Sequence, residues 1–325
     1  MCDEILSRQV FQCIKQTGLD CIDSCIVNVL LNKVKDYEFV FFDMLYFGFN
    51  DSIDSELIAP KICGSISDIK KHSFRFFQLC FSNAAMSHNP DDILQIDIEQ
   101  CYYFVRIKPE KCNWLKEYQV RDIPHFVILL KREEYGFLFA DPQFTEKTIF
   151  MEEKAFFEAY AGHLKAFFLL RRPTGVLDVK ELLLKEFHAF LYSLKPRENY
   201  TVLIKSLIQN NSLSNELRAE VPYIQSLEYK LTYQFPGLRF HFDKFIKLFY
   251  TSFIPSSSDL KSTIELSEKN NNDWMIAKAL IQKIKYTGQI NNEINLLMRR
   301  FQAITDNEQR LCEQLRTSLK TLGYV

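Results

Sequence analysis

A cysteine at the predicted start of a helix is the residue of this chain best suited to nucleophilic chemistry. Asp20 is a good helix N-cap, and Cys21 follows it directly. The positions after it are apolar at helical spacing: Ile22, Cys25, Ile26, Val29 and Leu30. Free backbone N–H groups and the positive end of the helix dipole favour a thiolate in this first turn. The alternative is that Cys21 and Cys25 are ordinary buried cysteines.

A predicted hairpin supplies the base that such a nucleophile requires. The stretch 125–144 reads HFVILLKREEYGFLFADPQF, with a strand from His125, a polar turn at 132–134 and a returning strand that stops at Asp141. Folding about position 133 makes His125 and Asp141 cross-strand neighbours, with Cβ atoms within about 5.5 Å. A histidine beside a carboxylate is oriented and made more basic. Cysteine at a helix start, then His, then Asp is the order of a papain-like site.

The same segments carry a family resemblance. The run DCIDSCI from Asp20 is similar to the Asp-Cys-Gly-x-x-Cys-Leu segment of the bacteriocin-processing cysteine peptidases. Residues 21–31, followed by FVFFDMLYFGFN at 39–50, more closely resemble the butirosin biosynthesis protein H family of papain-like acyltransferases. The His-x-Val at His125 and the Asp-Pro at Asp141 are similar in both families. The chain departs from the peptidases at Ile22, where they carry Gly, and in a shorter spacing from Gln16 to the cysteine.

The resemblance implies a catalytic triad of Cys21, His125 and Asp141, with Gln16 assisting the backbone N–H of Cys21 at the oxyanion. Asp23 and Ser24, in the first turn of the helix, are candidate substrate contacts, and helix capping is their other expected role. In the acyltransferase family, the segment that corresponds to residues 39–49 lines the active site. A buried core helix is the alternative for that segment.

Composition sets the class of protein. Of the 325 residues, 47% are hydrophobic and 14% aromatic, which is ample for a core, and the net charge of −1 does not favour nucleic acid or an anionic membrane. Nine cysteines without a framework spacing indicate free thiols in a reducing compartment. The N-terminus has no apolar signal segment, and residues 39–49 are too short to span a bilayer. We therefore expect a cytoplasmic location.

The predicted fold is α+β, with a papain-like domain over 1–175 followed by an all-helical domain over 176–325. Strands are expected near 74–80, 93–98, 101–107 and 165–170, and 151–164 is amphipathic. His72 and His88 are expected at the surface. Beyond residue 176, apolar residues repeat at helical spacing, and prolines break the pattern. This half is expected to bind a partner, form a homodimer or cover the site.

The predicted activity is transfer of an acyl group from a thioester to an amine through an acyl-enzyme on Cys21. The donor implied by the resemblance is a phosphopantetheine thioester on an acyl carrier protein, within secondary-metabolite biosynthesis, with no cofactor and no metal bound by the enzyme. Arg121, Lys131 and Arg132 are candidate carrier contacts. The alternatives are a peptidase or amide hydrolase with the same triad, a binding protein that keeps the fold, and a zinc site from Cys21, Cys25 and His125.

Overall fold

The candidate site lies on a six-stranded antiparallel sheet, which belongs to one of two units of the chain. The structure is a computed structural model. It describes residues 11–16, 18–50, 52–64, 68–87, 102–115, 125–171, 178–209, 212–255, 259–288, 290 and 293–324. The sheet unit comprises Met1–Tyr37 and Ile69–Val176, and the helical unit comprises Glu38–Asp68 and Leu177–Val325. The sequence prediction placed residues 38–68 in the first domain, whereas their contacts group them with the helical unit.

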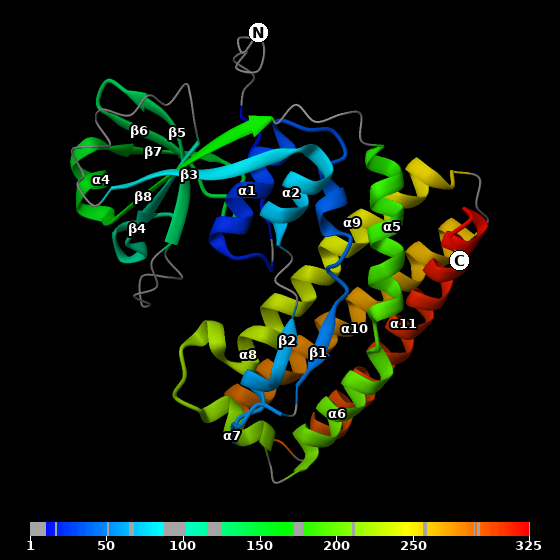
Figure 1. The fold of residues 1–325 in the computed structure, drawn as a ribbon. Coiled ribbons are helices and arrows are strands. Elements are labelled where there is room, and N and C mark those ends of the chain that lie inside the picture. Colours follow the sequence, from blue (N-terminus) through cyan, green and yellow to red (C-terminus); the bar gives the residue numbers. More distant parts are fainter. Residues whose placement is uncertain are drawn as a thin grey trace. The chain divides into compact units, whose positions relative to one another are not determined.

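The sheet of the first unit has the strand order β3-β8-β4-β5-β6-β7, with every neighbouring pair antiparallel (Figure 1). Its strands are β3 (Leu79–Ser87), β4 (Tyr102–Ile107), β5 (His125–Glu133), β6 (Gly136–Ala140), β7 (Thr148–Glu152) and β8 (Tyr160–Arg171). Aromatic and β-branched residues dominate β4 and β5, which favours strands. A buried core cluster lies on this sheet, and Val105, Val127, Phe137, Phe139 and Phe156 are among its members. The mixed α+β class is thus confirmed.

The hairpin of β5 and β6 turns at residues 134–135, slightly later than the predicted turn. Glu133 and Gly136 form its closing pair. One extra residue between Leu129 and Lys131 makes a bulge in β5. A Cβ on Gly136 would lie 2.2 Å from the carbonyl oxygen of Met151, so the close approach of β7 requires glycine there.

In the described part of this unit, three α-helices accompany the sheet: α1 (Cys21–Leu31), α2 (Ile69–Phe77) and α4 (Glu153–Ala159). The helix α1 packs against β5 and α2, and every residue from Ser24 to Leu30 is buried. The predicted helix that begins after Asp20 is confirmed, and its apolar side chains pack on the sheet.

Two predictions for this unit are wrong. The segment 74–80 was expected as a strand, but α2 continues to Phe77 and β3 begins at Leu79. His72 was expected at the surface, yet it lies on the inner face of α2 with 6% of its surface exposed. His88 and the strand expected near 93–98 lie outside the described residues.

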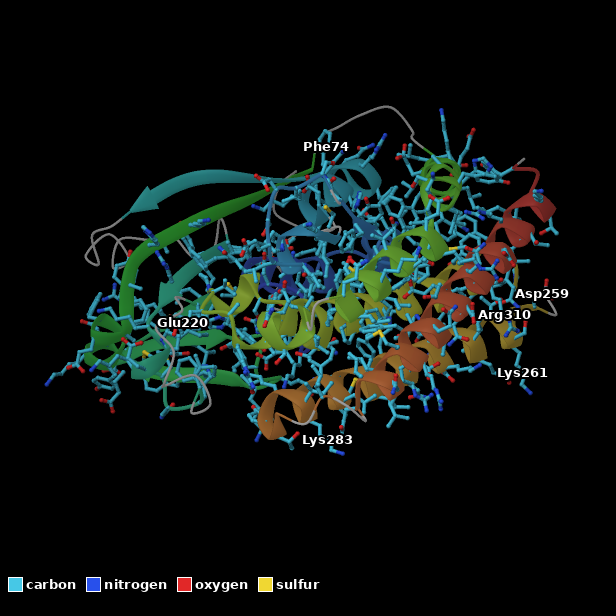
Figure 2. The ribbon with its side chains drawn as sticks, turned by 90° about the horizontal axis from the view of Figure 1, so that it is seen from below. Phe74, Glu220, Asp259, Lys261, Lys283 and Arg310 are labelled. Carbon is cyan, nitrogen blue, oxygen red and sulfur yellow. The ribbon has the colours of Figure 1, made fainter. Side chains whose placement is uncertain are left out.

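The helical unit consists mainly of the predicted helices. They are α5 (Val179–Ser193), α6 (Pro196–Ile208), α7 (Ser212–Arg218), α8 (Leu227–Tyr229), α9 (Phe235–Phe253), α10 (Asp259–Thr287) and α11 (Glu293–Thr321). A π-helical turn, Lys230–Gln234, joins α8 to α9, so Pro236 lies in the first turn of α9 and does not separate two helices. The long helices α10 and α11 lie side by side (Figure 1). Lys261 and Lys283 extend outward near the two ends of α10 (Figure 2).

The aromatic segment 39–49 is neither a core helix nor part of the sheet unit. It forms a 3₁₀ helix, Tyr37–Phe41, and then β1 (Phe47–Phe49), which pairs with β2 (Ile62–Gly64). The ring of Phe47 stacks on Tyr200 of α6 at 4.3 Å between centroids. The guanidinium of Arg239 donates to the carbonyl of Leu45 at 3.0 Å. These contacts tie the segment to the helical unit.

Within the described part of the chain, no helix combines the length and the apolar character that crossing a membrane requires.

Candidate active site

Cys21 is the first residue of α1, and its side chain is partly exposed. Asp20 caps the helix: its carboxylate accepts the N–H of Asp23 at 2.7 Å, and its carbonyl accepts the N–H of Ser24 at 2.9 Å. Among the described residues, none accepts the N–H of Cys21 or Ile22. Those two N–H groups, together with the helix dipole, therefore favour negative charge beside the sulfur.

Asn28 of α1 and Asn32, the C-cap of this helix, attach the segment before the cysteine to it. Asn28 and Asn32 are one helical turn apart, and each side chain makes a pair of hydrogen bonds to the backbone of one residue. Asn28 bonds the N–H and carbonyl of Ile14 at 2.8 and 2.9 Å, and Asn32 bonds those of Gln12, both at 2.8 Å. The segment 11–16 thus runs along α1 and forms neither a helix nor a strand.

The hairpin brings His125 and Asp141 together, although not in the predicted register. Ile128 pairs with Ala140, so the position opposite Asp141 is Val127 and not His125. The prediction of directly opposed residues is wrong by two positions: the later turn shifts the pairing by three, and the bulge in β5 takes back one. The long histidine side chain covers this diagonal offset. Its Nε2 lies 2.9 Å from Oδ1 of Asp141. His125 is 5% exposed and Asp141 is fully buried.

The electrostatics of His125 connect it to both partners. Burial acts to lower its pKa, while the charge of Asp141 and hydrogen bonds to Asp141 and Cys21 act to raise it. The net result is a pKa of about 9, above the ordinary 6.5. Since Nε2 is engaged with Asp141, Nδ1 is the ring nitrogen left for the sulfur of Cys21. A protonated imidazole beside Cys21 stabilises a thiolate there.

Asp141 has further partners that the sequence did not reveal. The indole N–H of Trp114 donates to its Oδ2 at 2.9 Å, and the backbone N–H of Gln143 donates to its Oδ1 at 3.3 Å. The ring of Phe144 lies edge-on to His125, with centroids 5.0 Å apart. In the sequence, Trp114 stands out only as the one tryptophan of the polar stretch 108–121.

Gln16 lies beside the triad but does not direct its amide donor toward it. Its backbone N–H donates to the carbonyl of Pro142 at 2.6 Å, which places it next to Asp141. Its side chain is fully buried, and Nε2 donates to the carbonyl of Ile14 at 3.3 Å. Oε1 has no hydrogen-bond partner among the described residues. In this conformation the N–H groups of Cys21 and Ile22 are the better placed donors for an oxyanion.

The two first-turn candidates differ in exposure. Asp23 is partly exposed at the helix start, where its negative charge also interacts favourably with the helix dipole. Ser24 is fully buried, and its hydroxyl has no partner within the described part of the chain. Asp23 can therefore contact a substrate directly, whereas Ser24 cannot.

The other cysteines near the site lie in interior positions. Cys25 is fully buried one turn after Cys21, its thiol lies 3.7 Å from the carbonyl oxygen of Phe126, and burial raises its pKa. Burial likewise raises the pKa of Cys13 and of Cys112 to about 12. A search of the described residues finds no group of three His, Cys, Asp or Glu suited to a metal ion.

The basic residues of the hairpin are paired locally. Lys131 lies 3.0 Å from Glu133, and Arg132 lies 4.0 Å from Glu153. Arg121 falls outside the described residues. The positive charge available to an acidic carrier at this turn is therefore partly compensated by neighbouring carboxylates.

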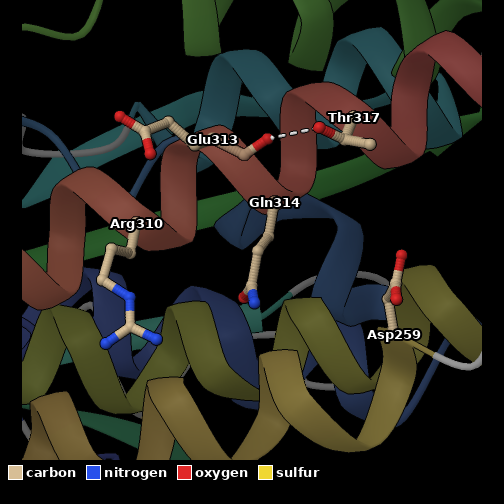
Figure 3. Close-up of a pocket in the computed structure, with 5 residues that line it drawn as sticks. All are labelled: Asp259, Arg310, Glu313, Gln314 and Thr317. Atoms are coloured by element: carbon tan, nitrogen blue, oxygen red, sulfur yellow. Dashed lines mark hydrogen bonds between the residues drawn. The ribbon is translucent and has the colours of Figure 1, made fainter.

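A hollow of about 270 Å³ lies elsewhere, in the helical unit, between the start of α10 and the last turns of α11 (Figure 3). Its lining is polar: Asp259, Arg310, Glu313, Gln314 and Thr317. It contains no cysteine, histidine or serine. The chemistry of the sheet unit, and not this hollow, therefore defines the candidate active site.

Comparison of the chain with protein-family models gives no match, and comparison with curated proteins gives no significant one.

Proposed function

We propose that this chain is a papain-like cysteine acyltransferase that moves an acyl group from a thioester to an amine. One observation supports this most: Asp141 is hydrogen-bonded to His125, and His125 lies next to Cys21, whose partly exposed sulfur is at a helix start. This is the arrangement of an activated cysteine nucleophile, in which a third group orients the base. The sequence resemblance to the butirosin biosynthesis protein H family supports the same activity.

The first half-reaction would form an acyl-enzyme. The thiolate of Cys21 attacks the thioester carbonyl, and the N–H groups of Cys21 and Ile22 stabilise the oxyanion of the tetrahedral intermediate. The bond from carbon to the leaving sulfur breaks, and that sulfur takes a proton from His125. Asp141 keeps the imidazole in its orientation throughout.

The second half-reaction would transfer the acyl group. An amine attacks the acyl-enzyme, and His125, now neutral, accepts its proton. The carbon–sulfur bond to Cys21 breaks, which releases the amide and restores the thiolate–imidazolium pair. Water in place of the amine would make the same residues a hydrolase or peptidase.

The donor that we propose is a phosphopantetheine thioester, presented by an acyl carrier protein, within a biosynthetic pathway in the cytoplasm. A reducing environment suits this thiol chemistry. Free thiols are found at Cys13, Cys21, Cys25, Cys63, Cys112 and Cys312. The enzyme itself would use no metal and no cofactor, because the thioester already carries an activated acyl group.

Intact-protein mass spectrometry tests the proposal. The protein is mixed with a panel of acyl thioesters, and we expect a mass increase of one acyl group on wild type but none on Cys21→Ala. Cys63 is a partly exposed thiol of the helical unit, so Cys63→Ala is the matched control and should acylate normally. Candidate amines are then added, and formation of amide would establish acyl transfer.

Other results would contradict the proposal. Release of free acid at the same rate with and without amines would make the protein a hydrolase. Cleavage of peptides that depends on Cys21, without reaction with any thioester, would make it a peptidase. A Cys21→Ala variant that acylates like wild type would remove Cys21 from the mechanism altogether.

A further inference from the structure

The two tryptophans of the chain make the same type of contact, one in each unit. The indole N–H of Trp114 donates to Oδ2 of Asp141 at 2.9 Å, and that of Trp274 donates to Oε1 of Glu308 at 3.2 Å. Both carboxylates are buried, with Asp141 at 0% and Glu308 at 1% exposure. Trp114 therefore contacts the oxygen of the triad carboxylate that His125 does not use.

The position of Trp114 is set by its own segment and not by the site. A 3₁₀ turn, Pro109–Lys111, is followed by buried Cys112, and the N–H of Leu115 donates to the carbonyl of Cys112 at 2.9 Å. Trp114 lies inside this second turn and packs against the core cluster of the sheet. The indole N–H thus reaches Asp141 from a hydrogen-bonded turn that packs on the core cluster.

Asp141 needs such a partner for two physical reasons. The terminal torsion of an aspartate is broad, so a bond to His125 alone leaves the carboxylate free to turn. Oδ2 is also inside the protein, where an anionic oxygen without a donor is strongly destabilised. Among the described residues, Trp114 is the only donor to Oδ2, whereas Oδ1 also accepts the N–H of Gln143.

We propose that Trp114 is a positioning residue of the active site, which holds Asp141 so that Oδ1 faces His125 and the imidazole stays oriented toward Cys21. The inference rests on the triad of the proposed function. It extends that triad by one residue that contacts neither substrate nor sulfur.

Other ionisable groups act on these three residues as well. Cys13, Cys25 and Cys112 lie close enough to Asp141 for its charge to raise the pKa of their thiols, and Cys21 lies next to His125. Further carboxylates that act on these thiols are Asp20, Glu110 and Glu146. Since burial raises the pKa of these three thiols, they add no charge beside Cys21 near pH 7.

The rate at which iodoacetamide alkylates Cys21 tests the role without knowledge of the substrate. The rate is followed by mass spectrometry of the peptide that contains Cys21, from pH 5 to pH 10. Trp114→Phe keeps a large ring and removes the N–H. We expect its alkylation rate at pH 6 to fall about 10- to 100-fold, because a mispositioned pair stabilises less thiolate. At pH 10 the two rates should converge, since the thiol ionises without help.

Trp274→Phe is the matched control, because it removes the same N–H from a buried carboxylate in the helical unit. It should lower stability and leave the alkylation profile as in wild type. A Trp114→Phe profile that coincides with wild type would overturn the inference. If Trp114→Phe does not fold, position 114 can carry the benzothiophene analogue of tryptophan, in which sulfur replaces only the N–H. A lower alkylation rate at pH 6 would then support the inference, and a profile equal to wild type would overturn it. The alkylation rate of Cys21 can be measured even if no thioester acylates the protein. The positioning role of Trp114 and the acyltransferase function can therefore be refuted independently.

Discussion

The two units each contain a buried ion pair, and the pairs differ in how completely they are hydrogen-bonded. In the sheet unit, His125 meets Asp141 at 2.9 Å, and in the helical unit Arg239 meets Glu308 at 2.8 Å. In both, burial acts to lower the pKa of the cation and the carboxylate raises it, and the net shift is upward. Charge and burial alone therefore do not separate the two pairs.

The pair of the helical unit is saturated. Glu308 accepts from Arg239 through two nitrogens and from the side chains of Tyr200, Asn270 and Trp274. The remaining nitrogen of the guanidinium donates to backbone carbonyls of the segment 44–46. Within the described residues, each nitrogen of the Arg239 guanidinium and each oxygen of the Glu308 carboxylate has a partner, so the pair holds the segment 38–68 on the helices and leaves no group for chemistry.

The pair of the sheet unit keeps one position for a reacting group. Asp141 accepts from His125, Trp114 and Gln143, and His125 has a second ring nitrogen besides the one that meets Asp141. His125 lies next to Cys21, so this pair ends at a partly exposed sulfur. This difference fits a structural role for the arginine pair and supports the proposed catalytic role of the histidine pair.

Replacement of His125 should have the largest effect. His125→Gln removes the acid and base, and we expect the rate of Cys21 acylation to fall about 10²- to 10⁴-fold, as for general acid–base catalysis. The rate is measured by mass spectrometry under single-turnover conditions, and chemical denaturation should show a smaller change in stability than Arg239→Met produces. If His125→Gln is acylated as fast as wild type, the His125–Asp141 pair has only a structural role.

Replacement of Arg239 should affect stability instead. Arg239→Met leaves Glu308 charged and buried, which should destabilise the helical unit by about 3 kcal/mol. Urea denaturation followed by the fluorescence of Trp274, in a Trp114→Phe background, reports this unit. The rate of Cys21 alkylation should be the same with and without Arg239→Met in this background. A lower rate with Arg239→Met would contradict a purely structural role for the arginine pair.

A double replacement sharpens the same point. Arg239→Met with Glu308→Leu removes both charges, and apolar residues of similar volume often tolerate such sites. We expect the double variant to be more stable than the sum of the two single changes predicts, by about 1–3 kcal/mol. Strict additivity in urea denaturation would show that the two side chains do not act as a pair.

The pH dependence of acylation distinguishes the two cations. His125 has a pKa of about 9, so it is protonated below that pH and able to give a proton to the leaving thiol. The acylation rate should fall about tenfold for each pH unit above 9, because the imidazolium is then lost. Arg239 does not titrate in this range. A rate that stays constant to pH 10.5 would show that the leaving thiol needs no proton from His125.

The smallest expected effect is at the cap of α1. Asp20→Ala removes the acceptor for the N–H of Asp23 and should lower the free energy of unfolding by about 1 kcal/mol. Thermal denaturation measures it, and Asp178→Ala, the cap of α5 in the helical unit, is the matched control. Only the change at Asp20 should also slow the alkylation of Cys21, because the cap orders the first turn.

The local elements of the fold follow from the amino-acid sequence alone. The N-cap and apolar spacing after Asp20 predicted α1, alternation and β-branched residues predicted β4, β5 and β6, and helical spacing predicted most of the second unit. These signals are local, since capping, turn formation and periodicity depend on residues a few positions apart. For the same reason, residue type and local pattern were enough to select Cys21, His125 and Asp141 as candidates.

The way in which these elements meet depends on tertiary packing. The turn at residues 134–135 shifted the pairing of the hairpin by three residues from the predicted one, and the bulge after Leu129 reduced this shift to two. The diagonal reach of His125 still allows its bond to Asp141. Trp114 has no sequence pattern of its own, because its role depends on a turn that places it against a carboxylate 27 residues away. The segment 38–68 joined the helical unit through long-range contacts with Arg239 and Tyr200. Such contacts are set by packing, which periodicity does not encode.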